Sequence, residues 1–300
     1  MKQMDLNILK DTPPWEWPRD AAKKFLAILR NPQAGADERL VAADLAGDMV
    51  AINDALVDAL LAIVVNSAEP EELRAKAAIS LGPVLEQSDI EMGDEGEFDD
   101  PDSVPIAEKT FRKIQQSLRK VYLDSAVPKL VRRRILEAAV RAPEDWQNQA
   151  IRTAYANDDP EWKLTAVFGM RYVRGFDKQI LEALESADPK IRYEAVTAAG
   201  NRELDAAWPN ISSLLTSSAT SKDLLLAAIE AAAVIRPREA VPLLMDLADS
   251  EDEDIAEAAD EAVSMAESAA DDDFDDEEYE GDDEDEDEDE PRGGNHKSVH

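Results

Sequence analysis

Ten basic side chains lie between Lys109 and Arg141, in the part of the chain best suited to binding an anion. Only Asp124 and Glu137 oppose them, so this segment sums to +8 in a chain whose formal charge is −35. Residues three, four and seven apart share one face of a helix, which brings the first members of the set together. The candidate anion or acidic-partner residues are Lys109, Arg112, Lys113, Lys120, Lys129, Arg133 and Arg134. The alternative is pairing of these cations with acidic residues of neighbouring helices.

Three consecutive arginines, Arg132 to Arg134, cannot all face the same way, because successive helical residues are about 100° apart. At least one of them must point towards a neighbouring helix pair. We expect this to be Arg132, because it occupies a position that is basic in several copies of the repeat described below.

The residues of most catalytic and metal sites are scarce in this chain. It has no cysteine, and both histidines, His296 and His300, lie among the last five residues. Thiol chemistry and zinc fingers are therefore excluded, and histidine general-base catalysis in a folded site is not expected. No glycine-rich phosphate loop of either common pattern is present. We expect no metal, no cofactor and no catalytic residue, and the overall negative charge makes a nucleic-acid partner improbable.

Two acidic runs contrast with the basic segment. Residues 271–300 contain 17 acidic residues, and such a density of like charge predicts a disordered tail. This tail either solubilises the protein or attracts basic proteins. The insert at 88–103 holds eight acidic residues and no basic one, and we expect an acidic loop there. Because the insert directly precedes the basic segment, we expect it, rather than the distant tail, to shield those cations.

The elements that would position these groups repeat along the chain. From about residue 19 to 270, amphipathic stretches alternate with short breaks that contain proline or aspartate, and no strand pattern is found. Each second stretch begins with an apolar lead residue followed four positions later by alanine, or once by isoleucine. The lead residues are Leu73, Val131, Trp162, Ile191, Leu224 and Ile255, with a weaker copy at Leu40. Most spacings lie near 31 residues, which indicates stacked helix pairs.

These stretches resemble HEAT repeats, as in Asp188-Pro189 followed by Ile191-Arg192, Ala195 and Gly200. The resemblance implies an all-α fold, an α-solenoid of about seven helix pairs, and the chain looks like uncharacterised bacterial HEAT-repeat proteins. Its implied function is a scaffold that binds protein partners on the concave face, where Lys163 and Arg192 are candidates. The alternative is a HEAT-like enzyme, either bilin-lyase-like or nucleic-acid-modifying.

The predicted organisation has three parts. A Pro/Trp-rich segment at 1–18, in which Trp15 and Trp17 cover the open end of the first pair, precedes the solenoid at 19–270, and the acidic tail follows at 271–300. The three prolines at 13–18 predict no helix there. The most apolar run has seven residues against the roughly 20 that span a bilayer, and no secretory signal is evident. We therefore expect a cytoplasmic protein that does not enter a membrane.

Overall fold

The computed structural model describes residues 6–93 and 105–278, which form helices and their connections without any strand. Seven helix pairs account for most of this part of the chain. Their first helices are α2 (Ala21–Leu29), α4 (Asp54–Val65), α7 (Glu108–Leu123), α9 (Asp145–Tyr155), α11 (Asp177–Leu184), α13 (Trp208–Thr216) and α15 (Pro237–Ala248). Their second helices are α3 (Ala36–Leu45), α5 (Glu71–Ile79), α8 (Lys129–Ala139), α10 (Pro160–Gly169), α12 (Pro189–Asn201), α14 (Lys222–Ile235) and α16 (Glu253–Glu278).

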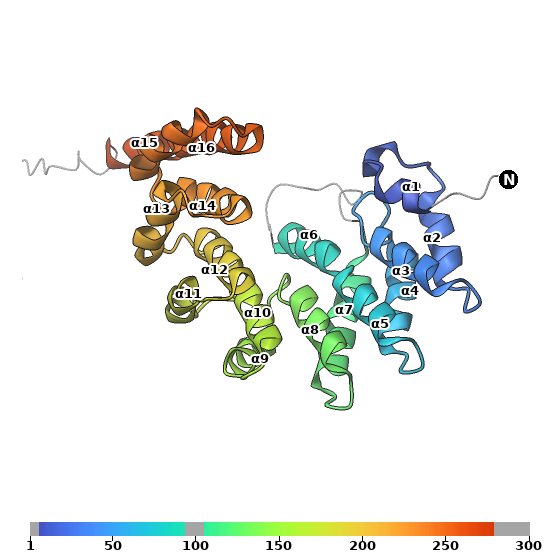
Figure 1. Ribbon diagram of the computed structural model, residues 1–300. Helices are drawn as coiled ribbons and strands as arrows, with labels where there is room; N and C mark the ends of the chain where they lie inside the picture. The colour runs from blue at the N-terminus through green and yellow to red at the C-terminus, as the bar shows by residue number, and fades with distance from the viewer. Residues whose placement is uncertain (1–5, 94–104, 279–300) are drawn as a thin grey trace, which may run out of the picture.

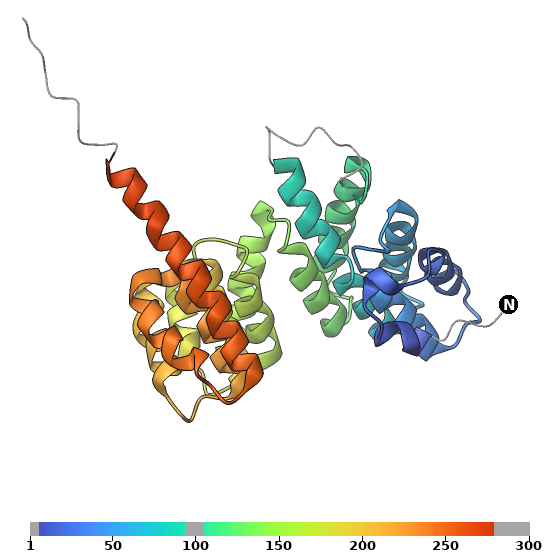
Figure 2. The same ribbon diagram turned by 90° about the horizontal axis from the view of Figure 1, so that it is seen from above.

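The second helices stack in chain order, each contacting the next from α3 to α16. The pairs follow an open arc, and α10, α12 and α14 lie on its inner side with α9, α11 and α13 outside them (Figure 1). A perpendicular view shows α16 crossing the end of the stack (Figure 2). The predicted α-solenoid of helix pairs is thereby confirmed. Within the described ranges, no helix combines the length and the apolar character needed to cross a bilayer.

Alanine at the fourth position after each lead residue explains the close stacking. Those alanines are fully buried, and so is the isoleucine that replaces one of them: Ala77, Ile135, Ala166, Ala195, Ala228 and Ala259. A methyl group at this position fills the interface while letting two helix backbones approach closely. This repeated position therefore contributes a fully buried apolar residue to each of these second helices.

Aspartates before two prolines start the second helices as the sequence indicates. The Asp159 carboxylate accepts a hydrogen bond of 3.0 Å from the Glu161 amide, and Asp188 accepts one of 2.9 Å from the Lys190 amide. Each satisfies a backbone donor that the first helical turn leaves without an intrahelical partner.

Two boundaries differ from the sequence expectations. Helix α6 (Gly82–Gly93) extends into the insert that was expected to be a loop from residue 88, because Ser88 is buried and Gln87 donates a hydrogen bond to Glu91 one turn later. Helix α16 ends at Glu278, beyond the expected boundary at 270, because extending an existing helix costs far less than starting one. The rest of the insert and the expected disordered tail from 279 lie outside the described residues.

The N-terminal segment also differs in part. It forms a short α1 (Leu6–Lys10) and a 3₁₀ turn at Pro14–Glu16, which accommodates the prolines because it is only three residues long. Trp17 covers the first pair as predicted: its ring meets Phe25 edge-on at 5.6 Å and its indole N–H donates to the carbonyls of Leu9 and Thr12. The same prediction is wrong for Trp15, which is 78% exposed.

Charged contacts join neighbouring pairs at separations of 30 to 32 residues, one repeat length. They include Arg39–Glu69, Lys76–Asp44, Lys129–Asp159, Lys222–Asp252 and Arg236–Asp205. The contact between Arg39 and Glu69 is the most enclosed of these, with two parallel hydrogen bonds of 2.6 and 2.8 Å. Arg39 also donates to the Leu29 carbonyl. The electrostatic links therefore repeat in register with the core.

Replacing Glu69 by glutamine should cost about 2 kcal/mol of unfolding free energy at pH 7, because two charge-assisted hydrogen bonds lose their carboxylate. The Arg39 side chain holds the pKa of Glu69 below its usual range of about 4.5. A carboxyl with a lowered folded-state pKa stabilises the protein above its unfolded-state pKa, and this stabilisation is lost as pH falls through the folded value. Urea unfolding at pH 7 and pH 3 should therefore show a smaller difference between wild type and variant at pH 3 than at pH 7. The exposed Glu72→Gln is the matched control, and a Glu69→Gln difference independent of pH would contradict the assignment.

Candidate functional site

The structure divides the basic candidates between two places. Lys109, Arg112, Lys113 and Lys120 lie on the exposed face of α7. Lys129, Arg133 and Arg134 instead lie on α8, where they join contacts with acidic residues. The two interpretations left open by the sequence, a binding surface and internal pairing, therefore apply to different helices.

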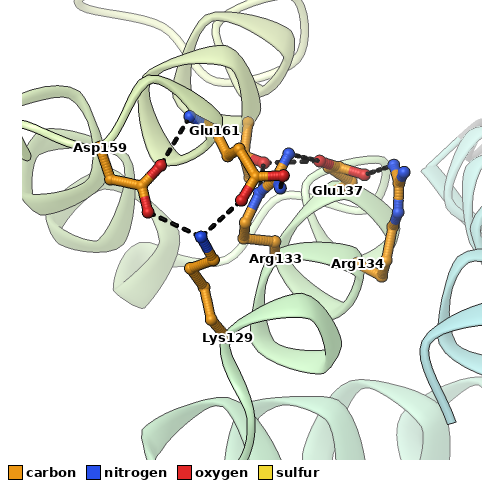
Figure 3. Close-up of polar contacts among 7 residues, drawn as sticks. Lys129, Arg133, Arg134, Glu137, Asp159 and Glu161 are labelled. Atoms are coloured by element: carbon orange, nitrogen blue, oxygen red, sulfur yellow. Dashed lines mark hydrogen bonds and ion pairs between the residues drawn. The ribbon is translucent and has the colours of Figure 1, made fainter. Parts of the chain in front are cut away.

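The α8 cations belong to a network that connects α8 to α10, two neighbouring second helices (Figure 3). Arg133 is only 4% exposed and Glu137 only 5%, although both are charged. The Arg133 guanidinium donates to the Thr165 hydroxyl at 2.9 Å and lies 2.9 Å from Glu161. The Thr165 hydroxyl in turn donates to Glu137 at 2.6 Å, and Arg134 donates to the other oxygen of Glu137. Arg133 and Glu137 are thus committed to this network.

Lys129 closes the outer end of the same network. Its ammonium group lies 2.7 Å from Asp159 and 2.5 Å from Glu161. These hydrogen bonds raise the pKa of Lys129 and lower the pKa values of both carboxyls, chiefly through the side-chain contacts themselves. Lys129, Arg133 and Arg134 are each paired with carboxylates of the same chain, which is the internal pairing that the sequence left open as the alternative.

At Arg74 and Arg132 the basic position after the lead residue faces the first helix of its own pair. Arg74 donates to the Val64 carbonyl at 3.0 Å and Arg132 to the Tyr122 carbonyl at 2.9 Å, in both cases ten residues back. These contacts satisfy carbonyls at the end of the first helix. Arg132 also lies over the Trp162 ring of the next pair, at 5.5 Å, as expected of the arginine that turns to a neighbour. Arg133 also turns to the next pair, where it contacts Thr165 and Glu161, although the sequence did not single it out.

Lys163 and Arg192 occupy this same position, and the structure places neither in the groove described next. The Lys163 ammonium lies 4.9 Å from the ring centre of Tyr155 on α9. Arg192 lines a hollow between the start of α12 and the end of α13, near Ser213 and Ser217. The concave-face expectation for these two residues differs from the structure because the position after the lead residue turns towards the outer helices.

An open groove follows the inner side of α12, α14 and α16. It consists of two adjoining hollows, of about 650 Å³ and about 430 Å³, which share Ala227 and Glu230. The floor is formed by small residues, and the rim carries exposed apolar side chains: Tyr193 at 39% exposure, Val234 at 37% and Met265 at 50%. Tyr193 lines the larger hollow, and Val234 and Met265 line the smaller one, so each hollow presents at least one exposed apolar side chain.

Three rim carboxylates of the groove, Glu203, Glu230 and Glu261, make no ion pair with the described part of the chain. A fourth, Glu194, is paired with Arg171. Burial raises the pKa of Glu194 and outweighs the opposing effect of the Arg171 charge. Because the salt bridge occupies this carboxyl, the available negative charge of the groove comes from Glu203, Glu230 and Glu261 together with Asp223, and Lys190 on the wall of the larger hollow opposes it. The groove therefore offers apolar contact combined with negative charge.

Sequence reasoning overlooked these groove residues, although the repeat register contains them. Counting six residues from the leads Ile191, Leu224 and Ile255 reaches the first set of groove residues, and counting ten reaches the second. These sets are Thr197, Glu230 and Glu261, followed by Asn201, Val234 and Met265. Offsets of six and ten residues are four apart, so they lie on one face of each second helix. The lead residue and the alanine four positions after it lie on a different face. Comparing the residues at the same offset in successive repeats would have identified this shared face.

We also searched the described residues for a metal site and for aromatic residues at the surface. The described residues hold no group of three or more side chains that could ligate a metal ion. Trp146, Trp162 and Trp208 are partly buried and pack against the core. They contribute to inter-helix packing, as expected for most tryptophans in a stacked fold.

Residues 178–270, which span α11 to most of α16, match the family model described as HEAT repeats. Apart from Leu164, the residues that line the groove lie within this matched segment, and the resemblance to HEAT repeats stated from the sequence is confirmed there. The earlier helix pairs continue the same stack of second helices. No curated protein matches this chain.

Two solved structures are similar to this chain at low identity. The Escherichia coli protein YibA is 16% identical, with a TM-score of 0.44 over 86% of this chain and 85% of that one. Human deoxyhypusine hydroxylase, solved in complex with glycerol, is 17% identical, with a TM-score of 0.38 over 87% of this chain and 96% of that one.

Proposed function

We propose that this protein is a non-catalytic interaction scaffold whose concave groove binds a segment of a partner protein. The observation that carries the proposal is the combination, along α12, α14 and α16, of exposed apolar side chains with carboxylates that lack an ion pair in the described chain. In a stack of repeats, equivalent residues of successive second helices lie in line along the surface. Such a surface can bind an elongated segment of a partner.

The chemistry of the groove specifies the partner segment. Its aliphatic residues would cover Val234 and Met265, and its lysine or arginine residues would lie opposite Glu230 and Glu261. Opposite charges across an interface accelerate association and select against acidic partners. The 17 acidic residues between 271 and 290, which follow the groove-lining part of α16, would strengthen this attraction at long range. The proposed partners are therefore basic proteins.

The double variant Glu230→Lys/Glu261→Lys should lower partner recovery by about tenfold or more, because attraction becomes repulsion at two central positions. The measurement is affinity purification of the full chain from its native cells with quantitative mass spectrometry. A recovered partner is then titrated as pure protein against both chains. The matched control is Asp246→Lys/Glu251→Lys, which makes the same change in net charge at exposed positions outside the groove. Equal losses of the same partners from both variants would contradict a groove site and indicate a general effect of charge.

A further inference from the structure

The exposed face of α7 is a continuous basic stripe that the proposed groove function does not use. Helix α7 buries one side, including Phe111, Ile114 and Leu118, against the core. Its exposed residues recur at helical spacing on the opposite side, so they form a single stripe. The α7 stripe consists of Lys109, Arg112, Lys113, Gln116, Arg119, Lys120 and Leu123. It lies far along the stack from the groove of α12, α14 and α16 (Figure 1).

The positive charge of the α7 stripe is only partly balanced. Lys113 pairs with Asp58 of α4 at 2.7 Å, and Arg112 lies 3.7 Å from Glu108 in a pair whose side chains are both more than half exposed. Lys109, Arg119 and Lys120 make no ion pair with any described residue. Cations placed three and four residues apart repel one another and weaken a helix. Lys120, in the last turn, also lies where a cation favours the helix dipole, whereas Lys109 lies in the first turn, where a cation does not.

We propose that the α7 stripe docks an extended acidic segment of a partner protein. From Lys109 to Leu123 the helix rises about 21 Å at 1.5 Å per residue, which about six residues of extended chain would span. The acidic residues of this segment would lie opposite the lysine and arginine side chains of the stripe. Leu123, 63% exposed at the end of the stripe, adds contact for one apolar residue beside the acidic run.

Carboxylates beside the α7 stripe favour a narrow polypeptide over a nucleic-acid duplex. Asp58 flanks the stripe at Lys113, and Asp89 of α6 lies close enough to Arg112 for the two charges to interact. Duplex DNA carries one negative charge per roughly 1.7 Å of its axis on two strands, so a duplex broad enough to cover the stripe would also bring phosphates against these acidic residues. A single acidic chain laid along the stripe meets the cations without that repulsion.

The test uses a fluorescein-labelled octapeptide of three Glu-Asp pairs with leucine at each end, titrated by fluorescence anisotropy against the full chain at low salt. Arg119→Glu/Lys120→Glu should weaken binding by about tenfold, since two unpaired cations become repulsive. Lys23→Glu/Lys178→Glu, on α2 and α11, is the control with the same net-charge change at exposed sites, and it should alter affinity less than about twofold. No binding to the wild-type chain, or equal weakening by both variants, would overturn the proposal.

Two further arms identify other occupants. An eight-nucleotide oligothymidylate that binds more tightly than the peptide, and is weakened by the same α7 variant, would overturn the proposal in favour of nucleic acid. In a second full-length chain, the acidic residues at 282–290 are replaced by their amides. A several-fold rise in peptide affinity would show that this chain's own tail occupies the stripe, and would overturn docking of a partner. Unchanged affinity would support it. None of these outcomes depends on the groove, so the scaffold proposal stands or falls separately.

Discussion

Arg133→Met should destabilise the protein by about 3 kcal/mol, because it removes the cation from a buried ionic network and leaves Glu137 largely desolvated. The Glu137 side chain is 7% exposed and that of Arg133 is 5% exposed. Methionine approximates the length of the arginine stem, so the loss reports charge and hydrogen bonding more than packing. Urea unfolding at pH 7 measures the effect directly.

The decisive comparison is the double variant Arg133→Met/Glu137→Leu. Each single change leaves the other buried charge with one partner fewer, whereas the double change removes both charges, and apolar replacement of a buried pair is often close to neutral. The Thr165 hydroxyl can then donate to a backbone carbonyl one turn back. We expect the double variant to cost about 1 kcal/mol or less, well below the sum of the singles.

Arg134→Met is the control for the network, because Arg134 contacts the same carboxylate while remaining 42% exposed. A partly exposed ion pair contributes little, so this change should cost about 1 kcal/mol or less. Additive losses in the double variant would mean that Arg133 and Glu137 are not coupled.

Gly47→Ala should have an effect of similar size, about 3 kcal/mol, for a steric reason. A Cβ atom at Gly47 would lie 2.3 Å from the Ser80 carbonyl oxygen and 2.7 Å from the Ser80 Cβ. Neither neighbour is the end of a flexible side chain, so relief requires the ends of α3 and α5 to separate. The expected result is a lower midpoint of urea unfolding, with the helical circular dichroism of the folded state retained.

Gly35→Ala provides the matched comparison. Its added Cβ would meet only the Glu38 Cβ at 3.9 Å, an ordinary contact, and its backbone at φ −57° suits alanine. This change should shift stability by less than about 1 kcal/mol. If Gly47→Ala proved as mild as Gly35→Ala, the close approach of α3 and α5 would not limit the packing of the first pairs.

Local and periodic features could be derived from the sequence. The leads from Leu73 to Ile255 all lie in second helices, and the alanine four positions later is buried in each case where it occurs. Asp159 and Asp188 cap the helices they precede. These features depend on neighbours within one or two helical turns, and the repeat presents the same pattern several times, so independent copies support one another.

Charge pairing could not be derived in this way. Lys113 meets Asp58, which lies 55 residues earlier on the other side of the insert, and this separation departs from the repeat period. Arg132, Arg133 and Arg134 have similar local sequence, yet their side chains have different partners because α10 meets α8 from one direction. Periodicity gives the orientation of a residue about its own helix axis. It does not give the position of the next helix.

The sequence by itself therefore determined the α-solenoid, its pair boundaries to within a few residues, and the presence of a dense basic segment in an acidic chain. Only the tertiary structure decided which of those cations remain available. It neutralised Lys129, Arg133 and Arg134 through α10, left Lys109, Arg119 and Lys120 without an ion pair in the described chain, and aligned three second helices into an acidic groove. The physical reason is that helix formation is governed by local periodicity, whereas electrostatic pairing is governed by distances between segments far apart in the chain.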